Sequence, residues 1–246
     1  MERNVQFEIT ALKDIVVRLA WAQLEIFADD VEKIQVLAAG DEGSVTDLRI
    51  MVREDALVVE QPQYGLSLNI TESKWMQVCV RVPRTWQAAI HVNTISGLLS
   101  ARGLCGSRIA LDTISGDLHA MRITAETLSV KTISGDVRGD GLTAQSLSAR
   151  SVSGRLALDA VEAKTIKSNS VSGEQAYHLK SVFQRMDVVA VSGDVVITSP
   201  VEMMNASMRS VSGHVRTEGV TLSEDRNAPV IRATGVSADL KLISVK

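Results

Sequence analysis

The stretch that decides the fold runs Thr113-Ile114-Ser115-Gly116-Asp117, and it returns as Thr132-Ile133-Ser134-Gly135-Asp136. Phrases of this kind occur eight times between residues 94 and 239, and their serines are spaced 19, 19, 19, 19, 20, 20 and 25 residues apart. A period that regular indicates one structural unit stacked on itself. Each Ser-Gly pair is predicted to form a corner of the coil. The predicted turn residues are Ser96, Gly97, Ser115, Gly116, Ser134, Gly135, Ser153, Gly154, Ser172, Gly173, Ser192, Gly193, Ser212 and Gly213.

Apolar side chains recur at fixed distances from these serines. In the first four repeats, leucine, isoleucine or valine stands three, eight and thirteen residues after the serine. Nineteen residues at about 3.3 Å each make a loop of roughly 60 Å, which fits two or three short strands and no helix. The sequence therefore predicts an all-β fold, a parallel β-helix or β-solenoid that is right-handed. Residues 91–246 would form about eight coils of 19–20 residues, continuous with an irregular β cap and first coils in residues 1–90.

The residue just before each serine is also apolar, and we expect it to belong to the interior columns. It is out of phase with the apolar residues that stand thirteen and fifteen positions after the preceding serine. A bend or bulge is therefore predicted near Ser-Gly, where glycine tolerates the required dihedral angles. These residues are Ile95, Ile114, Ile133, Val152, Val171, Val191, Val211 and Val236.

Two polar columns admit a functional interpretation. Asp117, Asp136, Asp194 and Asp239 could stack as calcium ligands, but other residue types fill this place in other repeats, and a turn whose side chains cap backbone groups is favoured. A hydroxyl column from Thr94 to Ser170 could order water on a flat face, as in ice-binding solenoids. Strand propensity and hydrogen bonds between coils explain that column equally well. No metal or cofactor site is predicted.

The fifth repeat departs from the pattern, with a glutamine in an apolar column and the only aromatic residues after Trp86. A local bulge that repacks the core around larger rings is the favoured interpretation. The alternative is an exposed patch for a ligand or partner, because aromatic and arginine side chains anchor interfaces. The candidate patch consists of Gln175, Tyr177, His178, Phe183 and Arg185.

The first ninety residues read as longer strands separated by turns. Strands are predicted over residues 14–21, 23–27, 48–52, 56–60 and 76–82, with turns at Asp29-Asp30, at 40–43 and at Tyr64-Gly65. Because a solenoid end must cover its core and block aggregation of its edge, this segment is expected to cap the coil.

Composition restricts the classes of partner. The net charge is −3, and no block of like charges provides the positive field that nucleic-acid binding needs. Cys79 and Cys105 fit no metal or redox spacing and are expected to be buried or partly buried thiols. The N-terminus lacks a secretory signal, and no run reaches the length of a membrane span. A cytoplasmic location is predicted, or a surface-associated one if a leader or anchor was removed.

The sequence resembles the bacterial putative-adhesin family of unknown function, whose members contain β-strand repeats. The serial Ile/Val-Ser-Gly-Asp phrases carry the resemblance, together with the lead-in Val80-Arg81-Val82-Pro83 and the strands at 23–26 and 31–36. The resemblance covers nearly the whole chain and implies an all-β solenoid with an adhesin-like role. It implies no catalytic residues.

Three functions are compatible with these sequence features. The first is a non-enzymatic structural or binding module, an adhesin-like rigid rod that presents one face to a protein or glycan. The second is a carbohydrate-active β-helix enzyme, for which Asp136, Arg138 and Arg155 are the nearest approach to a cluster. The third is a scaffold that assembles into a homo-oligomer. No cofactor is predicted for any of them.

Overall fold

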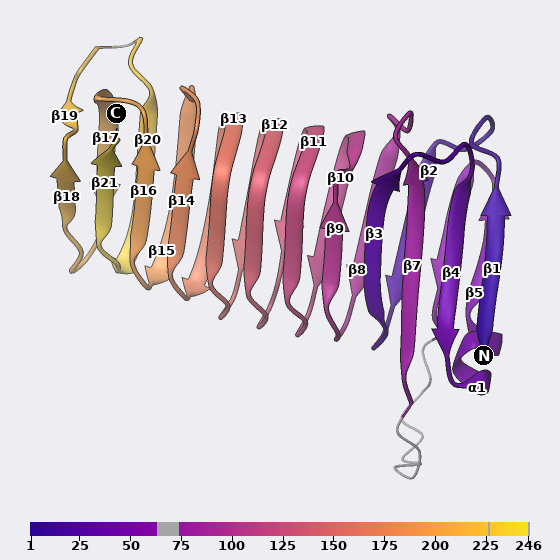
Figure 1. Cartoon of the computed structure of the whole chain (residues 1–246). Coiled ribbons are helices and arrows are strands. Elements are labelled where there is room, and N and C mark those ends of the chain that lie inside the picture. The colour runs from indigo at the N-terminus through magenta and orange to yellow at the C-terminus, as the bar shows by residue number, and fades with distance from the viewer. Residues whose placement is uncertain (63–73, 226, 246) are drawn as a thin grey trace.

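A computed structural model describes residues 1–62, 74–225 and 227–245. The chain winds into one row of stacked coils, with its two termini near opposite ends of the row (Figure 1). In the regular part, residues pair in parallel with residues 19 positions later, so that Leu128 faces Leu147 and Leu147 faces Ile166. The strands of this part are β8 (Ala89–Thr94), β9 (Leu99–Arg102), β10 (Cys105–Thr113), β11 (Leu118–Lys131), β12 (Val137–Ser151), β13 (Leu156–Ser172), β14 (Gln175–Leu179), β15 (Arg185–Ser192) and β16 (Val195–Ser199). Where β15 and β16 stack on β13 and β14, the paired residues are 20 positions apart. The predicted all-β solenoid is confirmed.

Each regular coil has three flat faces. Along β11 buried and exposed residues alternate, except at 121–122 and 126–127, where two exposed residues follow one another and the chain turns. We call the face that runs into the Ser-Gly corner (127–131 in β11) the incoming face, and the one that leaves the corner (118–121) the outgoing face. The predicted interior columns are confirmed, since the core residues Leu118, Ile123 and Leu128 are completely buried.

The column before the serine corrects the prediction, because it faces outward. Seven of its members are 41–49% exposed and Val211 is 84% exposed. The alternation of each strand continues in phase up to this residue, and the chain turns only after it. The inward position is therefore two before the serine, where Thr94, Thr113, Thr132 and Ser151 are buried. The hydroxyl column is thus no flat hydrated face.

Serine and glycine have separate roles at the corner. The Ser115 hydroxyl donates to the carbonyl oxygen of Ile95 (2.9 Å), and the same bond between coils recurs in later repeats. A Cβ atom on Gly135 would overlap the carbonyl oxygen of Gly116 in the coil below. Gly97, Gly173 and Gly193 do have positive φ. In the middle coils, however, glycine is required by the close approach of two backbones rather than by its dihedral angles.

The first coil in sequence is not the first in space. β2 (Asp14–Leu19) lies between β6 (Ala56–Glu60) and β8, and β3 (Gln23–Asp29) lies between β7 (Met76–Pro83) and β9, all in parallel. Three antiparallel strands extend these two rows of strands at the N-terminal end, one next to β6 and two beyond β7. They are β1 (Glu2–Phe7), β4 (Ile34–Gly40) and β5 (Arg49–Arg53).

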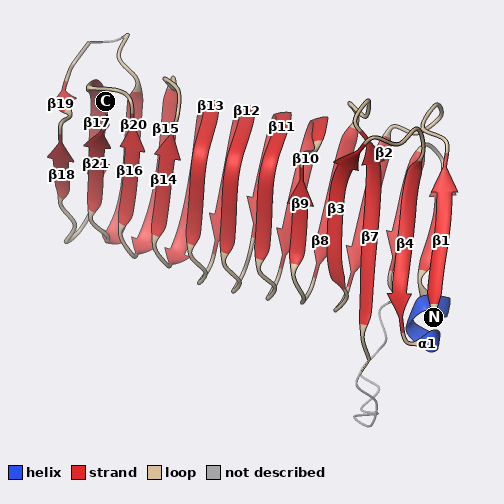
Figure 2. Ribbon diagram, viewed as in Figure 1, coloured by secondary structure: helices blue, strands red, loops and turns tan. Residues whose placement is uncertain are grey.

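One short helix stands where the sequence predicted only a turn. α1 (Glu42–Asp47) begins at Asp41, whose carboxylate accepts the backbone N–H of Ser44 (2.9 Å), and it buries Val45 at the N-terminal end of the row. Figure 2 shows α1 at that end and strands along the rest of the row. The predicted turn at Tyr64-Gly65 lies outside the described residues.

The other end of the row has the same irregularity. The last coil in sequence, β20 (Val230–Ser237) and β21 (Leu240–Ser244), lies between β15–β16 on one side and β17 (Met203–Arg209) and β18 (Val215–Glu218) on the other. β19 (Thr221–Leu222) pairs with β17 at the outer edge.

Two further predictions can be compared with the structure. Cys79 and Cys105 are partly buried, as expected, and both are free. In the part of the chain that the structure describes, no helix has the length and apolar character needed to cross a membrane.

Candidate functional site: an apolar ridge beside a polar groove

The outward column before the serines forms a continuous apolar ridge on the incoming face. Because β20 lies between β15 and β17, Val236 lies between Val191 and Val211 in space. Seven spacings of about 4.8 Å make the ridge about 34 Å long. Singly exposed apolar residues are ordinary, whereas a contiguous row of them is a candidate binding surface. In spatial order the ridge consists of Ile95, Ile114, Ile133, Val152, Val171, Val191, Val236 and Val211.

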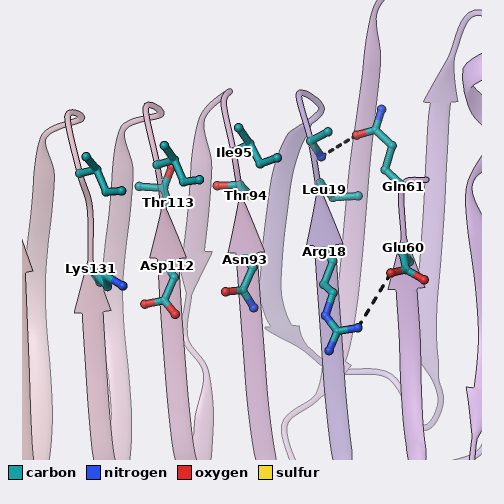
Figure 3. A pocket seen from close by; sticks show the side chains of 13 residues that line it. Arg18, Leu19, Glu60, Gln61, Asn93, Thr94, Ile95, Asp112, Thr113 and Lys131 are labelled. Atoms are coloured by element: carbon teal, nitrogen blue, oxygen red, sulfur yellow. Dashed lines mark hydrogen bonds and ion pairs between the residues drawn. The ribbon is translucent and has the colours of Figure 1, made fainter. Parts of the chain in front are cut away.

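A polar row runs beside the N-terminal part of the ridge, two residues earlier on each strand. At the N-terminal third it crosses five neighbouring strands, β6, β2, β8, β10 and β11 (Figure 3). The ridge and this row enclose a groove of about 340 Å³, a size suited to holding a side chain or a small polar group of a partner. The row consists of Glu60, Arg18, Asn93, Asp112 and Lys131.

The groove contains charges of both signs. At its N-terminal end, Arg18 Nη1 lies 3.9 Å from Glu60 Oε1. Burial raises the pKa of Asp112, and the nearby side chains of Lys131, His91 and Arg150 oppose that rise. The Asp112 carboxylate has therefore lost part of its hydration. A hydrogen-bond donor from a partner would take the place of the lost water contacts.

Gln61 closes the groove on the N-terminal side. Its side-chain oxygen accepts the backbone N–H groups of Ala20 (2.8 Å) and Trp21 (3.2 Å). The ridge begins one layer further on, at Ile95, and in the β2 layer this amide instead bonds the turn that follows the strand.

The predicted partner patch in the fifth repeat does not form one exposed surface. Gln175, Tyr177 and Phe183 are at most 2% exposed. The Ser168 hydroxyl is hydrogen-bonded to both the Tyr177 hydroxyl and the Gln175 side-chain oxygen, inside the core. Burial raises the pKa of Tyr177. The register of β13 against β14 shifts between Leu158 and Val161, which confirms the favoured interpretation of a bulge.

The two exposed members of that patch lie on different faces. His178 is on β14 of the outgoing face, where its Nδ1 is 2.6 Å from Asp159 Oδ1, and both residues line a hollow of about 260 Å³. Arg185 begins β15 on the incoming face, and its Nε donates to Asp187 Oδ2 (2.7 Å). This hydrogen bond lowers the pKa of Asp187.

The aspartate column caps backbone groups, as the favoured interpretation predicted. Asp117 Oδ1 accepts the N–H of Asp136, and Asp136 Oδ1 accepts the N–H of Arg155, each at 3.0 Å. Asp239 Oδ1 accepts the N–H of His214 (2.9 Å), which lowers the pKa of Asp239. Within residues 1–62, 74–225 and 227–245, no group of three or more His, Cys, Asp or Glu residues is arranged to hold a metal ion.

The ridge is the feature that the sequence prediction missed. The sequence feature that could have revealed it is the two-residue alternation of the strand. Continued from the buried residues thirteen and fifteen positions after a serine, this alternation places the residue before the next serine on the outside.

The fold and this surface define a β-solenoid whose distinctive feature is an apolar edge. The chain belongs to the family Toastrack DUF4097, whose model matches residues 12–241. Among curated proteins no sequence matches this chain.

Solved structures share the fold at low sequence identity. A putative adhesin from Parabacteroides distasonis superposes with a TM-score of 0.64 at 12% identity, over 98% of this chain and 97% of the other. A putative adhesin from Bacteroides fragilis gives 0.55 at 12%, over 100% and 97%. A putative lipid binding protein from Parabacteroides distasonis gives 0.54 at 14%, over 100% and 96%.

Proposed function

We propose that this protein is a non-enzymatic binding module, a rigid right-handed rod of about eight coils that presents its incoming face to a protein partner. The observation that carries the proposal is the ridge of eight outward isoleucine and valine side chains. Such an edge removes apolar surface from water only when a partner covers it.

A protein fits this surface better than a glycan. The ridge is aliphatic throughout, and the groove beside it offers carboxylate, amide, guanidinium and ammonium groups. An apolar centre flanked by polar groups is the composition of protein interfaces. The neighbours described as adhesins support a binding role, and they would agree with a surface-associated location.

The rigidity of the rod also supports this function. Serine hydroxyls and aspartate carboxylates link successive coils at the corner next to the ridge. A surface that is already ordered loses little conformational entropy when it binds.

Site-specific photo-crosslinking in the source cell tests the proposal. A benzoylphenylalanine at Ile133, on the ridge, should capture one defined protein, whereas the same probe at the exposed Gln145 on another corner should not. A second chain carrying the probe at Val152 together with Ile114→Thr and Ile133→Thr should lose the adduct while keeping its circular dichroism spectrum. Equal adducts from Ile133 and Gln145, or an adduct at Val152 unaffected by the two threonines, would contradict the proposal.

A further inference from the structure

A second concave site lies on another side of the rod, where the outgoing face ends. It is a cavity of about 430 Å³, and three arginines, Arg84, Arg102 and Arg122, line it. Phe27, Ala28, Asp29 and Gly103 complete its lining. None of these residues belongs to the ridge or its groove.

Four successive layers of the solenoid build this cavity. Arg84 follows β7, and its N–H donates to the carbonyl oxygen of Asp29 at the end of β3 (3.2 Å). Arg102 ends β9 beside Phe27, and Arg122 lies one layer further along, in β11. The two middle layers contribute the small residues Ala28 and Gly103. The space between them is open, because a Cβ atom added to Gly103 would still lie 3.9 Å from the Ala28 side chain. Long cationic side chains therefore stand around a floor of small residues.

The positive charge in this cavity exceeds the negative charge. Arg102 is held in place, with Nη2 3.3 Å from Glu25 Oε1 and its guanidinium carbon 5.0 Å from the centre of the Phe27 ring. Among the described residues, neither Arg84 nor Arg122 has a carboxylate oxygen within 4.0 Å. Asp29 is the single acid of the lining, and its Oδ1 accepts the N–H of Asp30 (2.8 Å).

The backbone of Arg122 provides a second observation. Its φ is 52°, and the residues 19 positions before and after it are Gly103 and Gly141, both with φ of 66°. The next coil has Ala160 at this corner, also with φ of 52°. The corner thus favours glycine, and a long side chain is retained there against a steric cost. Residues held in such conformations concentrate at ligand sites.

We propose that the cavity binds a phosphate group. Guanidinium groups match the oxygens of phosphate in shape and donate paired, charge-assisted hydrogen bonds. Arg102 is already oriented by Phe27 and Glu25, and Arg84 and Arg122 supply two uncompensated charges from opposite sides. The volume of the cavity exceeds that of a single phosphate ion, so a phosphate ester of a small molecule or of a lipid headgroup fits this site.

Titration with inorganic phosphate at low ionic strength, followed by calorimetry, tests the site. Arg84→Gln and Arg122→Gln should each weaken binding about tenfold, the loss of one charge-assisted contact of about 1.4 kcal/mol. Arg108→Gln removes the same charge from an exposed arginine on β10 and should change nothing. Absence of binding both to phosphate and to the vesicles described next, or equal weakening by Arg108→Gln, would overturn the proposal.

Vesicles distinguish the source of the phosphate. If the ligand is a headgroup, the protein should sediment with phosphatidylglycerol vesicles but not with phosphatidylcholine vesicles containing no anionic lipid, and Arg122→Gln should weaken sedimentation with the anionic vesicles about tenfold. If the ligand is a free phosphate ester, phosphate should bind and neither vesicle should.

Arg122→Gly separates a binding role from a structural one. Glycine suits the positive φ, so the melting temperature of this variant should rise while phosphate affinity falls. A variant with a lower melting temperature and unchanged phosphate affinity would show that Arg122 is structural, and the proposal would fail.

Discussion

At the scale of single residues, the constant part of the repeat is explained by contacts between neighbouring coils. The serine hydroxyl bonds a carbonyl oxygen of the coil below, and the threonine two residues earlier accepts the glycine N–H, as Thr132 does from Gly135 (2.9 Å). The glycine has no room for a side chain, because the carbonyl oxygen of the preceding glycine lies against it. Ser-Gly is therefore a stacking unit, and its recurrence reflects packing rather than ligand binding.

Gly135→Ala tests this explanation. The new methyl group would overlap the Gly116 carbonyl oxygen, and overpacking of this kind costs about 1–3 kcal/mol of unfolding free energy. Gly43→Ala is the matched control, since its Cβ would come no nearer than 3.8 Å to another residue and lies in α1. Urea unfolding should show a loss for the first and no loss for the second. Equal stability of Gly135→Ala and the natural chain would contradict the proposed contact.

At the scale of strands, the decisive property is phase. A strand that buries every second residue up to the corner places threonine inside and isoleucine outside, although isoleucine is the more apolar of the two. Hydrophobicity alone predicted the opposite arrangement and was wrong. Thr113 and Thr132 are stable inside because each hydroxyl accepts the N–H of the glycine at the corner.

Two truncations in one coil test the phase. Leu128→Ala removes a completely buried side chain and should cost about 2–5 kcal/mol. Ile133→Ala, five residues later, shortens a side chain that is 41% exposed, so its cost should stay near the ±0.5 kcal/mol typical of surface positions. The comparison is made by urea unfolding. Similar costs at both positions would mean that Ile133 is part of the core.

How much of the molecule the sequence could predict differs between its parts. The 19-residue period identifies the solenoid and the columns at Leu118 and Leu128, because each coil must accept the same side chains. It could not show that the polar side chains of Gln175 and Tyr177 are both hydrogen-bonded to Ser168 in the core, since that contact depends on the bulge beside them. Nor could it reveal the arginine cavity, whose members lie in different layers.

At the scale of the whole molecule, both ends of the row are irregular in the same way. At each end, the coil that is first or last in the sequence is not the outermost coil in space. The coil of β2 and β3 lies inside β6 and β7, and the coil of β20 and β21 lies inside β17 and β18. The repeat period cannot reveal this arrangement. β17 lies 20 residues after β15, so its columns would equally well stack directly on that strand.

An engineered disulfide distinguishes the two arrangements. β20 separates Val188 of β15 from Met208 of β17, and Ala233 is the partner of both. In a chain lacking Cys79 and Cys105, Val188→Cys with Ala233→Cys should oxidise to a disulfide. Val188→Cys with Met208→Cys should not, because two strand spacings of about 4.8 Å exceed disulfide reach.

Deletion of residues 223–246 should reverse the second result, because β17 would then stack directly on β15. Mass spectrometry reports each disulfide. A cross-link between positions 188 and 208 in the full chain would contradict the intercalated order.

The intercalated ends also constrain how the chain can fold during its synthesis. The layer formed by β2 and β3 leaves the ribosome early, yet both of its neighbours consist of residues after position 55. At the other end, the inner neighbour that β17 and β18 have in the folded protein is formed by residues 230–244, which emerge after them. Winding therefore cannot advance coil by coil from the N-terminus. The central coils, β10 to β13, are the segment that can form in order of synthesis, and the two ends must close around them afterwards.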